Sequence, residues 1–297
     1  MEFYANLHLH STHSDGVYTP EELVVVAKKE GYGALAIADH DTATAYPELL
    51  SACQKHDMEC ILATEFTTKV PMDTHIVGMD FDPDYPAMKQ YLSDMAEACV
   101  YTTKGCFDEA VELGNISDIT WEEVLSYNQN IRWLCNNHVF RAMKAKGLVD
   151  ESQYYEWYVE NFRYKKEKYK ADMEFLTIPQ IIDLIHKSGG IAFLAHPADE
   201  HIEIIDKFLE WGIDGIEASY STVTPERAKR IFEIAQKHNL YISGGSDHSG
   251  LCGGLYSSFS TEEALKNSDV YIEEHSIGVT YEHFSQIKKR QKSVNEE

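Results

Sequence analysis

Histidines and carboxylates in short clusters are the residues of this sequence best suited to chemistry. The chain has 14 histidines. Several stand beside other histidines or aspartates, in the segments His8-Leu9-His10, Asp39-His40-Asp41, Ala195-His196-Pro197 and Asp247-His248. Neutral imidazoles combined with a few carboxylates suit Zn, Mn or Fe better than Ca or Mg, which prefer oxygen ligands. These residue types therefore indicate a multinuclear metal hydrolase.

The elements that must position these residues are short aliphatic strands separated by helical stretches. We expect seven strands, over residues 4–10, 34–38, 60–64, 74–79, 191–195, 215–218 and 241–244. Their alternation with helices is typical of a parallel α/β protein. Helix starts lie between the strands, as at 19–22, where a threonine N-cap is followed by proline and by the glutamate of a capping box.

The candidate residues fall at the ends of the expected strands. His8 and His10 close the first strand, and alternation along the strand puts both on one side. His75 lies near the start or middle of its own strand. The remaining candidates follow later strands: Asp39, His40, Asp41, Glu65, His196, Asp247 and His248. The carboxyl ends of barrel strands converge on the face that holds the active site. Each residue alone has a plainer explanation, such as a turn at 39–41, but their convergence favours a common site.

The chain divides into a strand-containing part and a helical part. Between about residues 84 and 172 no strand is expected, and long helical patterns contain many aromatic residues. We therefore predict a discontinuous metal-binding barrel over 1–84 and 173–297, with a helical insertion over 85–172 that caps the substrate side.

Composition restricts the partners. The 297 residues contain 26 Lys and Arg against 49 Asp and Glu, a net charge of -23 with histidine neutral. Such a chain lacks the positive field that long nucleic acid or an anionic membrane would need. No apolar run approaches the length of about 20 residues of a membrane-spanning helix, and the six cysteines show no CxxC spacing. We expect a cytoplasmic protein with reduced thiols, no long nucleic acid and no membrane among its partners.

Several of these motifs together resemble the PHP (polymerase and histidinol phosphatase) family of metallophosphoesterases. The resemblance rests on the segments 8–16, 19–23, 38–42, 74–78, 189–197, 215–218 and 244–247 and on Glu65, in that order along the chain. It implies a distorted seven-stranded (β/α) barrel with an inserted helical domain and two to three divalent ions of Mn, Fe or Zn. The insertion further resembles the subgroup that hydrolyses nucleoside 3',5'-bisphosphates and trims RNA from its 5' end.

The resemblance also implies a set of metal ligands. His8, His10, Glu65 and Asp247 would hold the first ion. Glu65 would bridge to a second ion held by His75 and His196, whereas Asp15 and His40 would hold a third. A histidine two residues after the last aspartate usually completes the third site, but Ser249 stands there and His248 lies one residue earlier. Either the loop is rearranged so that His248 reaches the third site, or that site is weak or empty.

The expected reaction is hydrolysis of a phosphate ester by a metal-activated hydroxide. Asp39 and Asp41 flank His40, and one of them could orient its imidazole or protonate the leaving group. An Asx turn or a helix cap is an equally good explanation for either aspartate alone.

The expected substrate is a small phosphorylated metabolite, foremost a nucleotide, or short RNA. The subgroup has an Arg-Pro-His run where this chain has Asn136-Asn137-His138, so His138 is kept and the arginine is not. Arg132 or Arg141 could replace that arginine. The basic run 163–170 could bind a nucleotide tail, although a solvated helix face is the plainer interpretation.

Other functions stay open on the sequence alone. A histidinol-phosphate-type phosphatase would use the same ligands on another monoester. A metal-dependent amidohydrolase also carries HxH on a first barrel strand, but Asp15, Glu65 and the 39–41 triplet together favour phosphoesters. A noncatalytic metal-bound module is the third alternative.

Overall fold

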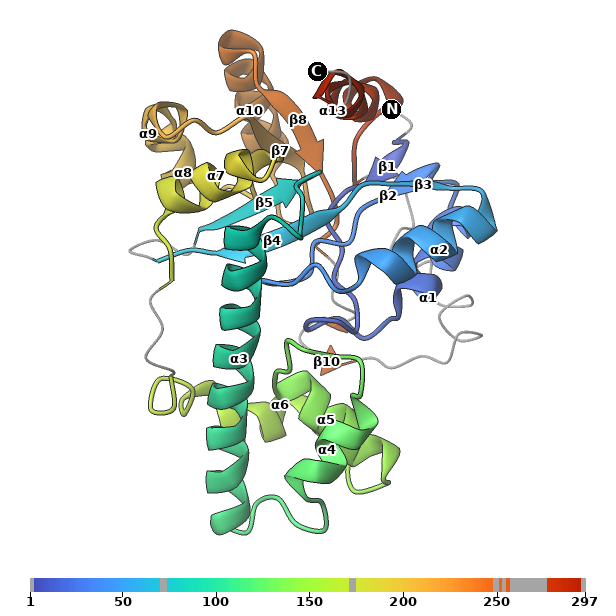
Figure 1. The fold of residues 1–297 in the computed structure, drawn as a ribbon, viewed down its shortest axis with the longest axis vertical. Helices are drawn as coiled ribbons and strands as arrows, with labels where there is room; N and C mark the ends of the chain where they lie inside the picture. Colours follow the sequence, from blue (N-terminus) through green and yellow to red (C-terminus); the bar gives the residue numbers. More distant parts are fainter. Residues whose placement is uncertain are drawn as a thin grey trace.

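The computed structural model describes residues 3–69, 74–170, 175–247, 251–252, 255–256 and 277–294. Its largest sheet has five strands in the order β4-β5-β6-β7-β8. These strands are β4 (Ala63–Thr67), β5 (His75–Met79), β6 (Ile191–Leu194), β7 (Gly215–Ser219) and β8 (Tyr241–Gly244). Figure 1 shows them at the centre of the upper part of the molecule, with helices on the outside. The sheet is therefore the scaffold around which the chain is arranged.

A second sheet contains three short parallel strands: β1 (Ala5–Asn6), β2 (Ala34–Leu35) and β3 (Glu59–Cys60). Backbone hydrogen bonds connect it to the larger sheet at both sides. Leu7 N–H donates to Gly244 O at 3.0 Å, and Glu65 N–H donates to Asp39 O at 3.2 Å. No sheet of the described residues closes on itself, so the α/β class is confirmed, whereas the seven-stranded barrel stays a prediction.

The prediction of parallel strands throughout is wrong for β5. β5 pairs antiparallel with both β4 and β6, whereas β6, β7 and β8 run parallel. The connection from Thr67 to His75 is too short for a parallel crossover, which needs roughly a dozen residues or more. Reversal places the first residue of β5, His75, beside the last residue of β4, Thr67. His75 thus reaches the same end of the sheet as Glu65, although it begins its strand.

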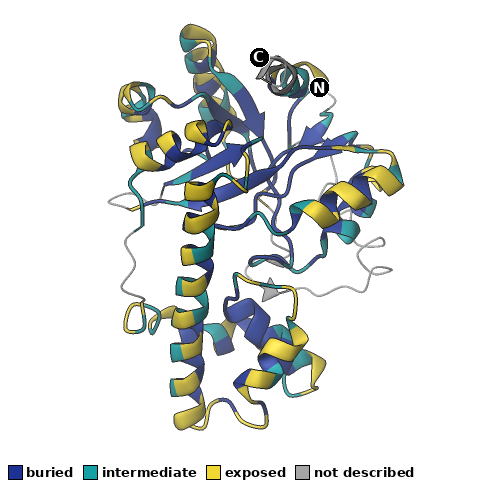
Figure 2. Ribbon diagram, in the orientation of Figure 1, coloured by how far each residue is buried: buried dark blue, intermediate teal, exposed yellow. Residues whose placement is uncertain are grey.

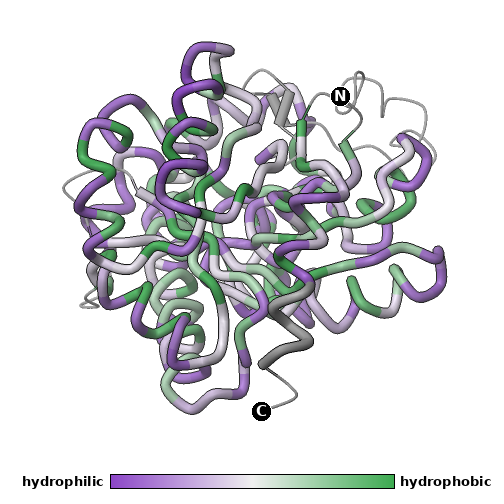
Figure 3. Tube along the Cα trace, turned by 90° about the horizontal axis from the view of Figure 1, so that it is seen from above, coloured by the Kyte–Doolittle hydropathy of each residue, from purple (hydrophilic) through white to green (hydrophobic). Residues whose placement is uncertain are grey.

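Capped helices pack against the sheets. Thr19 and Thr177 form capping boxes with Glu22 and Gln180, and a proline occupies the first turn of each of these helices. The helices around the sheets are α1 (Pro20–Lys29), α2 (Tyr46–His56), α7 (Ile178–Lys187), α8 (Asp199–Glu203), α9 (Ile205–Glu210), α10 (Pro225–His238) and α13 (Tyr281–Val294). Figure 2 shows buried strands between helices whose outer faces are exposed. In Figure 3 these peripheral helices alternate between hydrophilic and hydrophobic stretches, as amphipathic helices do.

The predicted insertion contains the long helix α3 (Pro86–Glu112), which descends from the sheet region in Figure 1, and shorter helices beside its lower half. These are α4 (Trp121–Tyr127), α5 (Asn136–Ala145), the 3-10 turn η1 (Glu151–Gln153), α6 (Tyr154–Tyr158) and the π-helix η2 (Val159–Arg163). They share a hydrophobic cluster of their own, which includes Phe107, Phe140 and Trp157. The exact domain boundaries stay a prediction.

Two short strands, β9 (Leu251–Cys252) and β10 (Leu255–Tyr256), form a separate antiparallel pair.

Within the described ranges, no helix combines the length and apolar character needed to cross a membrane.

Candidate metal centre

Glu65 stands at the centre of a cluster of imidazoles. It lies in the middle of β4 and is fully buried. Its Oε1 lies 2.8 Å from His75 Nδ1 and 2.8 Å from His196 Nε2. Its Oε2 lies 3.1 Å from His40 Nδ1 and 3.4 Å from His10 Nε2. Oε2 also lies 3.5 Å from His8 Nε2, so one carboxylate contacts five histidines from four different segments of the chain.

The side chains form three overlapping groups whose ligand atoms lie within 4.8 Å of one another. They are His8, His10, Glu65 and Asp247; Glu65, His75 and His196; and His10, Asp15 and His40. The structure therefore brings together all the described residues that the sequence predicted as metal ligands. The first two groups match the predicted ion sites, and the third adds His10 to Asp15 and His40. His248 and Ser249 lie outside the described residues.

Tight backbone contacts hold these segments together. A Cβ added to Gly245 would lie 2.2 Å from His8 N, and one added to Gly16 would lie 2.3 Å from His10 O. Only glycine permits these approaches, which join the end of β8 and the loop before α1 to the segment of His8 and His10. Two candidate ligands are themselves in the left-handed backbone region, His196 with φ 25° and Asp247 with φ 55°. Such strain persists only where the surrounding structure enforces it, and it is common at functional sites.

Two carboxylates of the cluster, Glu65 and Asp247, are held ionised. Burial raises the pKa of Glu65, but the surrounding histidines, His8 first, outweigh burial and lower that pKa well below its usual range. Burial would raise the pKa of Asp247, but its hydrogen bond from His10 and the charges of His8 and His10 together lower it. Burial would lower the pKa of His10, yet Asp15, Asp247 and Glu65 together raise it to about 9. Ionised carboxylates facing imidazoles are the electrostatic arrangement that divalent cations stabilise.

The cluster contains buried polar atoms that have no hydrogen bond among the described residues. They include His8 Nε2, His10 Nδ1 and Glu65 Oε2. Leaving such atoms unpaired in the interior is costly, and native proteins rarely do so. A nitrogen and oxygen donor set of this kind fits a transition metal. The residues present therefore fit the implied metal ions.

Glu217 is a residue of this site to which the sequence assigned no role. It lies in β7 and is fully buried. Its Oε1 accepts a hydrogen bond from His8 Nδ1 at 2.9 Å, and its Oε2 accepts one from the backbone N–H of His196 at 2.7 Å. A carboxylate that holds Nδ1–H leaves the Nε2 lone pair of the same ring free to bind a metal. The signal in the sequence was a charged residue within an otherwise apolar strand.

Asp39 and Asp41, which the sequence offered as catalytic or positioning residues, both accept internal hydrogen bonds. Asp39 accepts bonds from Ser11 N–H at 2.7 Å, from Ser11 Oγ at 2.6 Å and from Ser14 Oγ at 2.5 Å. Asp41 accepts bonds from Thr67 N–H at 3.0 Å and from Thr67 Oγ1 at 2.7 Å, and burial raises its pKa to about 7. These contacts fix the loops around His40. A direct catalytic role for either aspartate stays a prediction.

Residues of α5, two of them predicted to bind substrate, hold the loop that carries Asp15. His138 Nε2 lies 3.1 Å from Thr12 O, and its Nδ1 accepts a bond from Cys135 N–H at 3.0 Å. Arg141 donates to Gly16 O at 3.1 Å and Asn137 donates to Asp15 O at 2.5 Å. These bonds lock the 12–16 loop against the helical region.

Arg132, the other candidate, is exposed. The roles of His138, Arg141 and Arg132 in substrate binding stay predictions.

A cavity of about 390 Å³ opens beside the third ligand group. It is lined by Asp15, His40, Trp133, Cys135, Asn136, Asn137, Tyr154, Tyr155, Tyr158 and Lys166. Its volume lies within the range of roughly 300–1,000 Å³ that is usual for small-molecule sites. The Trp133 ring stacks near His40, with centroids 5.9 Å apart. The cavity therefore joins the candidate metal ligands to an aromatic wall.

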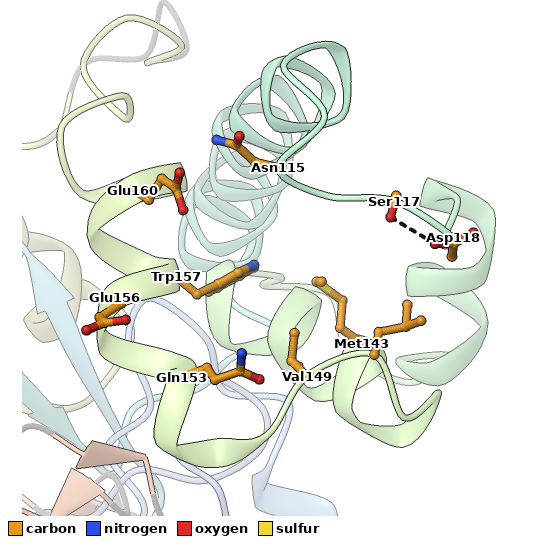
Figure 4. A pocket seen from close by; sticks show the side chains of 10 residues that line it. Asn115, Ser117, Asp118, Met143, Val149, Gln153, Glu156, Trp157 and Glu160 are labelled. Carbon is orange, nitrogen blue, oxygen red and sulfur yellow. Dashed lines mark hydrogen bonds between the residues drawn. The ribbon is translucent and has the colours of Figure 1, made fainter.

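A second cavity of about 370 Å³, drawn in Figure 4, lies within the helical region and contains none of the candidate ligands. Its lining includes the carboxylates of Asp118, Glu156 and Glu160. Such a lining disfavours a phosphate by like-charge repulsion. The cavity beside His40 is therefore the better candidate for a phosphorylated substrate.

Comparison with known proteins places this chain in a family. The model of the PHP domain matches residues 6–243, so the chain belongs to the PHP domain family and the resemblance read from the sequence is confirmed.

Among its relatives, the 5'-3' exoribonuclease of Haemophilus influenzae is 31% identical over 264 residues, which cover 84% of this chain and 91% of the relative. The 3',5'-nucleoside bisphosphate phosphatase of Chromobacterium violaceum is 26% identical over 270 residues, or 82% of this chain and 86% of the relative. A solved structure from Bifidobacterium adolescentis, assigned as a metal-dependent phosphoesterase, aligns with a TM-score of 0.73 at 24% identity over 97% of this chain and 96% of that one. This last similarity shows a shared fold.

Proposed function

We propose that this chain is a metal-dependent phosphoesterase that hydrolyses a phosphate ester of a small nucleotide or of short RNA. The observation that carries the proposal is the sharing of Glu65, whose carboxylate has two oxygens, between two overlapping ligand groups. Shared ligands hold ions close together, and paired ions suit displacement at phosphorus. The names of the two relatives, an exoribonuclease and a nucleotide phosphatase, support the nucleotide class.

His8, His10, Glu65 and Asp247 would hold one ion, Glu65 with His75 and His196 a second, and Asp15 and His40 a third. When bound, such ions lower the pKa of a water molecule and neutralise charge that develops on the phosphoryl group. The protein's own groups keep this arrangement in place. Glu217 fixes the His8 ring, Asp39 and Asp41 fix the loops around His40, and α5 fixes the loop of Asp15.

The acidity of the whole chain is compatible with an anionic substrate. Three carboxylates among the proposed ligands, Asp15, Glu65 and Asp247, would face four to six positive charges from two or three divalent ions. The site would then be locally positive although the chain carries a net charge of -23. The whole-chain charge still disfavours extensive contact with long nucleic acid.

The test is a phosphate-release assay with purified protein and added Mn²⁺. Nucleoside 3',5'-bisphosphates, nucleoside 5'-monophosphates, short 5'-phosphorylated RNA and histidinol phosphate would be compared. We expect turnover of at least one nucleotide substrate, loss of turnover with a chelator and loss of turnover in His8→Ala. Absence of release from every phosphoester in the panel would reject the proposal, and hydrolysis of an amide panel instead would support an amidohydrolase.

A further inference from the structure

The basic run 163–170 contains five cations, and their contacts differ. Lys165 Nζ lies 3.4 Å from Glu109 Oε1, Lys168 pairs with the other oxygen of Glu109, and Lys170 Nζ lies 3.7 Å from Glu167 Oε2. Arg163 donates to the hydroxyl of Tyr155 at 3.2 Å. Lys166 makes no ion pair within the part of the chain that the structure describes. Arg163 likewise forms no ion pair there, so two cations of the run lack a carboxylate partner, and of these Arg163 is already hydrogen-bonded to Tyr155.

Among the residues that the structure describes, Lys166 is also the only lysine or arginine that lines the cavity beside His40. Its Nζ lies 5.3 Å from the centre of the Tyr158 ring, and Tyr158 lines the same cavity. Lys166 is half-buried, so water screens its charge less than that of a fully exposed lysine.

The same cavity receives the start of α5. Asn136 and Asn137, the first two residues of α5, both line it. The N-terminus of a helix carries partial positive charge and N–H groups without intrahelical partners. Lys166 and this helix end together give the cavity a positive side, opposite in sign to the carboxylates that line the second cavity.

Trp133 supplies a flat apolar wall of the cavity beside His40. Its ring lies over His40 with an interplanar angle of 30°, and it is neither fully buried nor fully exposed. A planar heterocycle stacks favourably on such an aromatic face regardless of its identity. The lining of the cavity thus includes Asp15 and His40, an aromatic face and one ammonium group.

We propose that Lys166 is a specificity-determining residue, which binds an anionic group of the substrate other than the one that is hydrolysed, while Trp133 stacks on the substrate's planar base. The inference rests on the proposed function, because it places the hydrolysed phosphate at the metal ligands. It assigns to Lys166 the task that sequence reasoning gave to Arg132 or Arg141. Arg132 does not line the cavity, and Arg141 is bound to main-chain carbonyls of the 12–16 loop.

The test compares Lys166→Gln with Lys165→Gln, a control that removes a neighbouring charge already paired with Glu109. Substrates are adenosine 3',5'-bisphosphate, which has a second phosphate, and adenosine 5'-monophosphate, which does not. Loss of a charged hydrogen bond at a half-buried site corresponds to about a tenfold loss of affinity. We expect Lys166→Gln to raise KM for the bisphosphate about tenfold with little change in kcat. For Lys166→Gln, KM for the monophosphate should stay within about twofold of the wild-type value. For Lys165→Gln, KM for both nucleotides should also stay within about twofold of wild type.

Lys166→Arg keeps the charge and should restore most of the affinity, which separates a binding role from a structural one. Equal effects of Lys166→Gln and Lys165→Gln, or equal losses for both nucleotides, would overturn the inference. Thermal melting would establish that each variant is folded.

A binding measurement separates this inference from the proposed function. Isothermal titration of adenosine 3',5'-bisphosphate into wild type, Lys166→Gln and Trp133→Leu requires no turnover. Binding that depends on Lys166 and Trp133 without hydrolysis of any phosphoester would reject the proposed function and support the cavity assignment. Hydrolysis of a phosphoester, combined with an affinity for the bisphosphate that does not depend on Lys166, would support the proposed function and reject the cavity assignment.

Discussion

Replacing Glu217 by glutamine tests whether a residue that touches no substrate sets the metal affinity of the site. Glu217 is fully buried and accepts two hydrogen bonds, from His8 Nδ1 at 2.9 Å and from the His196 backbone N–H at 2.7 Å. Glutamine has the same shape but only one accepting oxygen. It can satisfy one of these donors, and its NH₂ group must then face the other.

Each orientation of the glutamine has a cost. If its oxygen keeps the His196 N–H, its NH₂ group favours a His8 ring whose proton is on Nε2, and that nitrogen can no longer bind a metal. If its oxygen keeps His8 Nδ1–H, two donors face each other at His196. Loss of a carboxylate that orients a metal-bound histidine typically lowers metal affinity about 10- to 100-fold. At about 1.4 kcal/mol per factor of ten, the change is about 1.4 to 2.8 kcal/mol of binding free energy.

The assay is calorimetric titration of Mn²⁺ into chelator-treated protein, with Glu233→Gln as the matched control. Glu233 is an exposed glutamate of α10 and its nearest cation, Lys229, lies 4.0 Å away. We expect Glu233→Gln to bind Mn²⁺ as tightly as wild type does. Glu217→Gln should bind Mn²⁺ about 10- to 100-fold more weakly. A dissociation constant within twofold of wild type, in a Glu217→Gln protein with an unchanged circular dichroism spectrum, would refute the tautomer argument.

Four further outcomes are expected. Glu65→Gln should reduce the Mn²⁺ content measured by elemental analysis and abolish turnover, because Glu65 belongs to two ligand groups; normal content with normal turnover would contradict this. A chelator should lower the melting temperature, since bound metal stabilises only the folded chain. Gly245→Ala should lower the free energy of unfolding in urea by about 1 to 3 kcal/mol, because its methyl group would meet His8 N; an unchanged midpoint would argue against the close approach. Burial holds the pKa of His138 well below its usual value, so its ring signals in NMR should not titrate between about pH 5 and 8. The unfolded chain binds that proton below about pH 6.5, so this residue's contribution to stability is lost as the pH falls.

The cluster of candidate ligands was predictable from the sequence because residue type and approximate strand position are local properties. The HxH pair, the histidine between two aspartates, Glu65 in β4 and the histidine after β6 are imidazoles and carboxylates in or next to strands. Capping boxes at Thr19 and Thr177 likewise indicate where helices begin without knowledge of the rest of the fold. The family followed from the order of these motifs along the chain.

The direction of β5 could not be predicted from its own residues. A strand's apolar pattern is the same in both directions, and only its pairing with β4 and β6 distinguishes them. The reversal explains why His75, at the start of its strand, still reaches Glu65. The one local indication of an antiparallel β5 was the connection from β4, which is too short for a parallel crossover.

What the sequence by itself determined is the chemistry available: a set of imidazoles and carboxylates that could bind metal, on an acidic chain. Only the tertiary structure decided which groups act together. Glu217 meets His8 across 209 positions of sequence, and Lys166 lines a cavity with Asp15 and His40, whereas Arg141 is bound to a loop. Donor types are written into single residues, but hydrogen-bond partners and ion pairs depend on distances that are set when remote segments pack.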